Sequence, residues 1–215
     1  MLLINKYQRS KLDNNPDELF YFKPKFTHHL DSCFRKRLTS LYKSEIKPNS
    51  KVLDLMSSWV SHLPIGIKYK EVVGHGLNNE ELKANEALDN YWIQNLNSNQ
   101  ELPFKDNIFD ICLIVAGWQY LQYPEFIAKE LSRISVNGGK LIISFSNRAF
   151  WNKATMIWSE STDFQRIEYI SKVLNNNGWK VEKVITESDK KPRIMGLFSI
   201  QNDPFFSVIS NKLNY

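Results

Sequence analysis

KVLDLMSSWVSHLP, residues Lys51 to Pro64, is the stretch around which this chain is organised. It opens with a short apolar run, typical of a buried parallel strand, formed by Val52, Leu53, Leu55 and Met56. Asp54 interrupts the run, and a carboxylate there is costly unless it is hydrogen-bonded or faces a ligand. In doubly wound folds, ligands bind at the carboxyl ends of the strands, where the chain turns towards a helix. We therefore expect a binding site between Asp54 and His62.

Length and composition favour a single domain. A chain of 215 residues is long enough for one well-buried α/β domain and short for two, and its 42% hydrophobic and 24% charged residues are ordinary for a soluble protein. The N-terminus does not read as a signal peptide, and no apolar run approaches the roughly 20 residues of a membrane span. Cys33 and Cys112 give neither a disulfide framework nor a metal site, and Cys112 is expected to be buried. We expect a cytoplasmic protein with no membrane span and no metal.

The net charge of +5 mildly favours anionic partners but is far from the signature of a nucleic-acid-binding protein. Two basic clusters stand out, Arg35-Lys36-Arg37 and Lys190-Lys191 with Arg193. Both are interpreted as solvated faces or loops rather than phosphate sites. We predict no nucleic-acid partner, and the sequence leaves open a monomer or a homodimer.

Strand-like and helix-like segments alternate along most of the chain. Strands are expected at residues 51–56, 71–77, 91–96, 109–116, 140–146, 179–186 and 195–201, and helices at 34–46, 78–88, 124–136, 150–160 and 164–176. Asp31 or Ser32 is expected to cap the first helix, and Asn78 with Glu81 fits a capping box. Alternation demands parallel strands with right-handed crossovers, whereas the last two strands, with no helix between them, need one antiparallel member. The sequence thus predicts a doubly wound, mostly parallel α/β sheet of seven strands with helices on both faces.

The first 33 residues are irregular and include the aromatic segment FYFKPKFTHHLD. Such a segment cannot form a core alone, so we expect it to lie across the main domain. The predicted organisation is an N-terminal lid-like segment and helix at residues 1–45, followed by a Rossmann-like domain at residues 46–215.

Four segments resemble the class I S-adenosylmethionine-dependent methyltransferases, and among them the branch called type 11. They are KVLDL, EVVGHGLNNEEL, ELPFKDNIFDICLIVAGWQYL and ELSRISVNGGKLIISFSNR, which together cover about residues 46–148. SSWVSHLP with FSNR further resembles a smaller, divergent subgroup. The resemblance implies the strand order 3-2-1-4-5-7-6 with the last-inserted strand antiparallel, S-adenosylmethionine as cofactor, and methyl transfer to a small-molecule acceptor, with an anionic acceptor as one option.

The cofactor site that the resemblance implies departs from the family pattern in two places. Asp54 stands at the acidic position of the first strand, but Leu55-Met56-Ser57-Ser58-Trp59 replaces the glycine-rich turn that should follow. Asp54, Met56, Ser57 and Ser58 are the cofactor-binding candidates here. Glycine there lets the backbone approach a ligand closely. The ribose-binding acid that usually ends the second strand is also missing, because Gly76 stands at its position.

The other cofactor-binding candidates follow from the same alignment. Gly74 and Gly76 are predicted to leave room for the cofactor, and Asn78 either reaches the ribose or only caps a helix. Asn95 and Leu96 are placed at the adenine. The remaining candidates, at the end of the fourth strand, are Ala116 and Gly117.

Methyl transfer is an in-line displacement that needs mainly alignment, and a base only when the acceptor arrives protonated. Trp118, Gln119 and Tyr120 are candidates for shaping the reaction pocket, with plain core aromatics as the alternative for the two rings. His62 is a candidate base, or merely a helix cap. The substrate-binding candidates are Asn147, Arg148, which is suited to an anionic acceptor, His29 and Tyr21.

The leading hypothesis is a methyltransferase acting on a small molecule. A non-catalytic binding or scaffold protein on the same fold is the alternative, motivated by the altered turn and the missing acid. A nicotinamide-dependent oxidoreductase is disfavoured because the only G-x-G, Gly74 to Gly76, follows the second strand and not the first. AGWQYL also lacks the Asn/Asp-Pro-Pro-aromatic motif of amino-methylating nucleic-acid enzymes.

Overall fold

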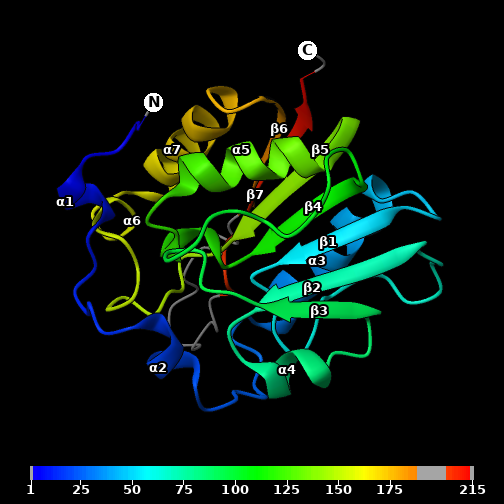
Figure 1. The fold of residues 1–215 in the computed structure, drawn as a ribbon, viewed down its shortest axis with the longest axis horizontal. Coiled ribbons are helices and arrows are strands. Elements are labelled where there is room, and N and C mark those ends of the chain that lie inside the picture. The colour runs from blue at the N-terminus through cyan, green and yellow to red at the C-terminus, as the bar shows by residue number, and fades with distance from the viewer. Residues whose placement is uncertain (1, 188–201, 214–215) are drawn as a thin grey trace, which may run out of the picture.

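The computed structural model describes residues 2–187 and 202–213. Its strands form one sheet in the order β3-β2-β1-β4-β5-β7-β6 (Figure 1). They are β1 (Lys51–Leu55), β2 (Glu71–Gly76), β3 (Asn90–Ile93), β4 (Phe109–Val115), β5 (Ser135–Phe145), β6 (Trp179–Glu187) and β7 (Phe205–Lys212). β1 to β5 pair in parallel, and β7 runs antiparallel to both of its neighbours. The predicted fold class and strand order are confirmed.

The helices cover both faces of this sheet. They are α1 (Lys6–Arg9), α2 (Asp17–Tyr21), α3 (Ser32–Glu45), α4 (Asn79–Lys83), α5 (Pro124–Ile134), α6 (Met156–Ser159) and α7 (Asp163–Asn175), with a 3₁₀ turn η1 (Trp118–Tyr120) after β4. Figure 1 shows α5 and α7 on one face and α3 on the other. In the described ranges, no helix has both the length and the apolar character needed to cross a membrane.

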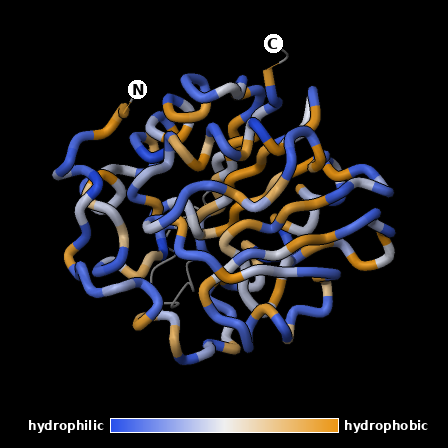
Figure 2. The backbone as a smooth tube through the Cα atoms, viewed as in Figure 1, coloured by the Kyte–Doolittle hydropathy of each residue, from blue (hydrophilic) through white to orange (hydrophobic). Residues whose placement is uncertain are grey.

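Alternate residues of the central strands feed two separate cores, since successive side chains of a strand point to opposite faces. Leu53 and Leu55 pack in the core that includes α5 and α7, whereas Val52 packs in the core formed with α3. Figure 2 shows the hydrophobic tube of the central strands enclosed by more hydrophilic segments. Fully burying one such side chain contributes about 1.5–3 kcal/mol, so these two cores hold the sheet rigid beneath the site.

Several expected elements differ in the structure. Of the helix predicted at residues 150–160, only α6 forms. The backbone N–H of Thr155 donates to Gln119 O, and Thr155 forms an isolated β-bridge with Lys11, so the residues before α6 are not helical. β5 begins at Ser135, so the last two residues of the helix predicted at 124–136 belong to this strand, which starts before the predicted strand at 140–146. The predicted strand at residues 195–201 and the cluster of Lys190, Lys191 and Arg193 lie outside the described residues, and the last described strand is β7.

The capping predictions are confirmed in one case and only half confirmed in the other. Asp31 caps α3 by accepting a hydrogen bond from the N–H of Phe34 at 2.7 Å. Asn78 caps α4, but the carboxylate of Glu81 does not complete a capping box. It binds the N–H of Lys25 and the hydroxyl of Ser58 instead.

The N-terminal segment is anchored to the main domain by buried polar contacts. Arg9 donates to both carboxylate oxygens of Glu125, at 2.7 and 3.0 Å, and Leu3 N–H donates to the same carboxylate. Farther along, Asp31 and Asp203 each accept a hydrogen bond from the other's backbone N–H. Figure 1 shows α1, α2 and α6 on the side towards which the arrows of β1, β2 and β4 point. The segment therefore lies at the carboxyl ends of the strands.

Candidate functional site

A cavity of about 560 Å³ lies at the carboxyl ends of β1, β2 and β4. Its volume falls within the roughly 300–1,000 Å³ that is usual for small-molecule sites. Every site residue predicted from the sequence lines this cavity except Gly74 and Trp118. Gly74 lies within β2, where an added Cβ would meet the side chain of Leu88. The fold thus brings together residues from six separate parts of the chain.

Asp54 is buried at the end of β1, with 3% of its surface exposed. Its Oδ2 accepts a hydrogen bond of 2.6 Å from the Ser57 hydroxyl. Asn85 supports this arrangement by donating to the hydroxyl of Ser61 at 2.9 Å and to Ser58 O at 2.9 Å. Burial raises the pKa of Asp54 to about 6, and the hydroxyls of Ser57 and Ser61 work against that rise. The carboxylate is therefore ionised but incompletely compensated at neutral pH.

The turn after β1 is held by a histidine that the sequence analysis did not single out. Met56 has a left-handed backbone with φ of 59°, which is uncommon for a residue other than glycine. Its N–H donates to Nδ1 of His75 at 3.1 Å, while Nε2 of His75 contacts Gln94 O at 2.8 Å. Burial lowers the pKa of His75 to about 4, so the ring is neutral, with Nε2 as the donor. The available signal was a histidine within VVGHG, a strand segment whose other residues are apolar or glycine.

The two departures from the family pattern are one structural feature. A Cβ at Gly76 would lie 2.9 Å from the carbonyl oxygen of Ser57, closer than real Cβ atoms come to backbone. Ser57 is fixed in this position because its N–H donates to His75 O at 2.6 Å. The residue that ends β2 therefore cannot carry an acidic side chain while the turn keeps this path. The serine turn occupies the space that a ribose-binding acid would need.

Glu81 is a second buried carboxylate on the cavity wall, and from the sequence only a capping role was expected of it. Its oxygens accept from the Ser58 hydroxyl at 2.6 Å and from the N–H of Lys25 at 2.7 Å. Asn78, beside it, accepts from Glu81 N–H and donates to the carbonyls of Tyr21 and Phe22. The polar atoms of Asn78 are thus occupied by the cap and by the N-terminal segment.

The wall at the end of β4 is shaped by close packing. Ala116 has a φ of 48°, and Gly117 lies against Met56, whose Cβ would be 2.9 Å from a Cβ added at Gly117. Trp118 points away from the cavity into the core of α5 and α7, with 1% of its surface exposed. Trp118 therefore does not line the cavity, and its ring takes the position of a core aromatic, the alternative that the sequence left open.

The predicted substrate-binding residues meet on the far side of the cavity. Nε of Arg148 binds Asp203, so this guanidinium is already paired. The Tyr120 hydroxyl accepts from Phe150 N–H at 3.0 Å, and burial raises the pKa values of both Tyr120 and Tyr21. His29 packs edge-on against Phe150 at 5.2 Å.

Asn95 and the following loop join the cavity to the N-terminal segment. Asn95 donates to Glu18 at 2.9 Å, and Asn97 donates to Asp17 at 2.9 Å and to Tyr120 O at 3.0 Å. Asp17 in turn accepts from the buried ammonium of Lys11 at 2.8 Å. Within the described ranges, no group of three or more histidine, cysteine or acidic residues is placed to hold a metal ion.

This sheet order, with a cavity over the ends of β1 and β4, defines the class I methyltransferase fold. A Bacillus halodurans protein named as a methyltransferase has the same fold, with a TM-score of 0.61 and 13% identity over 85% of this chain and 100% of that one. The [4+2]-cyclase SpnF also matches, with a TM-score of 0.58 and 10% identity over 83% of this chain and 82% of that one. Identities this low establish the fold alone.

The family is established by the sequence itself. The model of the methionine biosynthesis protein MetW family matches residues 37–166, which is more than half of the chain, so the protein belongs to the MetW family. A demethylmenaquinone methyltransferase of Bacillus cereus is 32% identical over 107 residues. That match spans 46% of this chain and 45% of the relative, less than half of its length.

Proposed function

We propose that this protein is an enzyme that transfers a methyl group from S-adenosylmethionine to a small-molecule acceptor. The observation that carries the proposal is the cavity of about 560 Å³ at the carboxyl ends of β1 and β4, with the side chain of Asp54 buried in its wall. This is the place where doubly wound folds bind their ligands. The family membership and the methyltransferase relative support it.

The residues present fit this cofactor in volume and in chemistry. Leu96 and Leu121 offer apolar walls for the adenine, and both are almost completely buried. Asp54 would face the positively charged part of the cofactor, and Gly117 lines the cavity at the end of β4. In place of the missing acid on β2, Glu81 supplies a buried carboxylate on the same wall. When bound, the cofactor supplies a methyl group activated by a positively charged sulfur.

The chain's own residues would orient the acceptor and manage its proton. His62 is neutral at pH 7 because burial and the nearby charges of Arg35 and His28 lower its pKa to about 4. A neutral imidazole is free to accept a proton from the acceptor. Tyr120 accepts a hydrogen bond from the backbone and keeps its own proton, since its pKa is raised, so it would act as a donor that positions the acceptor.

We also propose that residues 1–45 act as the lid-like unit over this site. Three hydrogen bonds support this: Asn78 binds the carbonyls of Tyr21 and Phe22, and Asn95 binds Glu18. Each joins a predicted cofactor residue to the N-terminal segment. Tyr21 and His29 would then enclose the acceptor from above.

A non-catalytic binding protein is the second candidate, and one observation favours it. The carbonyl of Ser57 fills the position of the ribose-binding acid, so the site departs from the family pattern where the cofactor would lie. A [4+2]-cyclase on the same fold illustrates that the fold alone does not decide the reaction.

Calorimetric titration with S-adenosylhomocysteine, the product form of the cofactor, tests the proposal. We expect a micromolar dissociation constant, equivalent to about −8 kcal/mol, and at least a tenfold loss in Asp54→Asn. Asn14→Asp, which alters an exposed residue of the N-terminal segment, is the control and should bind normally. Absence of binding at millimolar ligand would reject the enzyme and favour the binding protein.

A further inference from the structure

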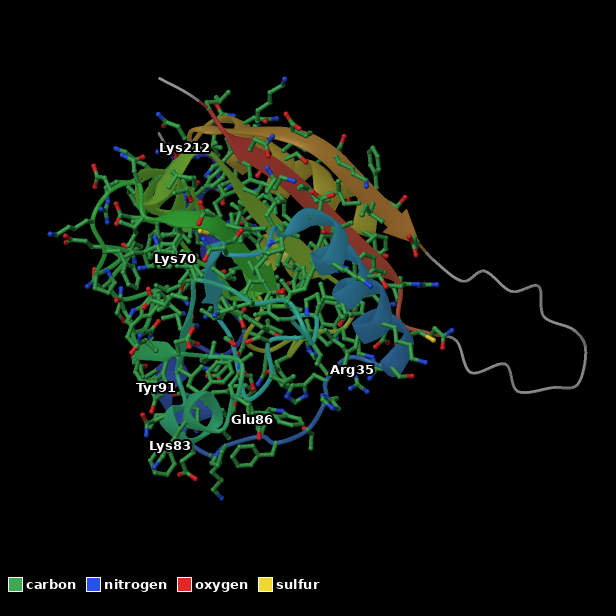
Figure 3. The ribbon with its side chains drawn as sticks, turned by 90° about the vertical axis from the view of Figure 1, so that its right-hand side faces the viewer. Arg35, Lys70, Lys83, Glu86, Tyr91 and Lys212 are labelled. Atoms are coloured by element: carbon green, nitrogen blue, oxygen red, sulfur yellow. The ribbon has the colours of Figure 1, made fainter. Side chains whose placement is uncertain are left out.

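We propose that Arg35, His62 and His28 form a subsite for an oxyanion, a carboxylate or phosphate group, carried by the acceptor. This proposal deepens the proposed function, because it names the chemical class of the molecule that would receive the methyl group. All three side chains line the cavity. Figure 3 labels Arg35 at the end of α3 that the N-terminal segment joins.

Arg35 carries a charge that no acidic side chain balances in the part of the chain that the structure describes. Its Nε donates to the backbone carbonyl of Asp31 at 3.3 Å, and this is the hydrogen bond that its side chain makes. Its neighbours differ: Arg37 pairs with Glu187 at 3.1 Å, and Arg148 pairs with Asp203. The guanidinium is therefore available as a planar donor, whose fork matches a carboxylate or a phosphate in two parallel hydrogen bonds.

His62 is brought beside Arg35 by the helix geometry of α3. Thr39 follows Arg35 by one helical turn, so the two side chains lie on the same face. The Thr39 hydroxyl donates to His62 O at 3.0 Å and ties the β1 turn to this face. His62 is held there with a left-handed φ of 54°, an unfavourable conformation that needs such support. Neither ring nitrogen of His62 has a hydrogen-bond partner among the described residues.

His28 completes the group from the N-terminal segment. Its ring lies 6.2 Å from that of His62 and stacks on Trp59 at 4.7 Å. The pKa of each histidine is lowered, first by burial and then by the charge of Arg35, so the guanidinium lies close enough to both rings to act on them. A bound anion would offset the charge of Arg35.

The acidic groups of the surroundings are engaged elsewhere. Asp31 accepts from the N–H groups of Phe34 and Asp203, and Asp203 accepts from Arg148. Asp54 accepts from the Ser57 hydroxyl, and Glu81 accepts from the Ser58 hydroxyl and from the N–H of Lys25. Arg35 lines the cavity without an acidic partner among the described residues, so an acceptor with a negative group would match this part of the wall.

This subsite revises two expectations from the sequence. Arg148 was predicted to hold an anionic acceptor, but its partner Asp203 already occupies it. Arg35 was assigned with Lys36 and Arg37 to a solvated basic face. The helix in fact turns Arg35 to the cavity, while Lys36 is exposed and lies outside the cavity wall.

The test is a titration of the full chain with sodium benzoate and, separately, inorganic phosphate, followed by NMR of the histidine rings at constant ionic strength. We expect saturable shifts of the His28 and His62 signals with at least one probe, and at least tenfold weaker binding in Arg35→Gln. The probe that saturates at lower concentration identifies a carboxylate or a phosphate. Lys36→Gln removes the same charge one residue away and should bind as the wild type does.

Two further variants keep the result decisive. Arg35→Lys retains the charge without the planar guanidinium and should bind the anion with intermediate affinity. If Arg35→Gln unfolds at a lower temperature than the wild type, Arg35→Lys takes its place in the comparison. If Arg35→Gln binds both anions normally, or if Arg148→Gln alone abolishes binding, the subsite is wrong. Titration of the same proteins with S-adenosylhomocysteine reports separately on the proposed function, because a failure there leaves the anion result standing.

Discussion

Restoring the missing ribose-binding acid, with Gly76→Asp, should damage the site rather than improve it. A Cβ at this position would lie 2.9 Å from the Ser57 carbonyl and 3.3 and 3.4 Å from the methyl groups of Leu82. The Leu82 side chain can adjust, but Ser57 cannot move freely, since its N–H binds His75 and its hydroxyl binds Asp54. The strain must therefore pass into the turn that presents Asp54.

Overpacking of this kind costs about 1–3 kcal/mol. For a protein of this size, 1 kcal/mol lowers Tm by about 2–4 °C, so we expect a decrease of about 2–12 °C in Gly76→Asp. Because the displaced Ser57 also carries the hydrogen bond to Asp54, affinity for S-adenosylhomocysteine should fall at least tenfold, which is about 1.4 kcal/mol.

Thermal unfolding and calorimetric titration measure the two effects, and Gly76→Ala separates their causes. The alanine variant adds the Cβ without the carboxylate, so it should show most of the loss in Tm and in affinity. Tighter binding by Gly76→Asp together with an unchanged Tm would refute the reasoning, because it would mean that the Ser57 carbonyl yields freely to a side chain at the end of β2.

Three other perturbations probe the same region. Asp54→Asn should gain stability relative to the wild type as pH rises from 4 to 7. The folded pKa of Asp54, about 6, lies above its ordinary value of 3.8, so the wild type loses about 3 kcal/mol of unfolding free energy when Asp54 ionises and the variant does not. A pH-independent difference between the two proteins in urea denaturation would contradict this. His75→Asn should have the opposite effect, since a folded pKa of about 4 for His75 gives stability that is present above pH 6.5 and lost as pH falls to 4, and the same titrations check it. Arg9→Met should cost about 3–5 kcal/mol by leaving Glu125 buried without its partner, while exposed Lys6→Met on the same helix should stay within about 0.5 kcal/mol.

The fold could be predicted because its signals are local. Runs such as FDICLIVA are strands in almost any context, and the resemblance supplied the strand order. Residues 150–155 misled the prediction because their backbone partners, Gln119 and the N-terminal segment, are distant in sequence. The cavity wall was anticipated for the same reason as the fold, since it follows the strand ends.

The roles of individual side chains were harder to predict, because they depend on contacts that no spacing encodes. Trp118 and Arg148 were both predicted as site residues. In the structure the ring of Trp118 packs in the core, and the guanidinium of Arg148 pairs with Asp203. Neither His75 nor Arg35 was predicted as a site residue. In the structure His75 binds the Met56 amide, and Arg35 lines the cavity. The orientation of a side chain around a helix end or turn is decided by its partners across the fold.

The signs of the charged groups in the cavity suit the proposed reaction. At pH 7 Asp54, with a pKa of about 6, is mostly ionised, while His62 and His75, both with a pKa of about 4, are neutral. The β1 turn therefore presents one buried negative charge to a cationic methyl donor, and Arg35 presents a positive charge to an anionic acceptor. If the oxyanion itself receives the methyl group, the positive charge of the donor and the negative charge of the acceptor both disappear, and the largely apolar walls of the cavity favour such a change over the separated ions. The same walls make each of the two opposing protein charges necessary, because either ion would bind poorly without its own partner.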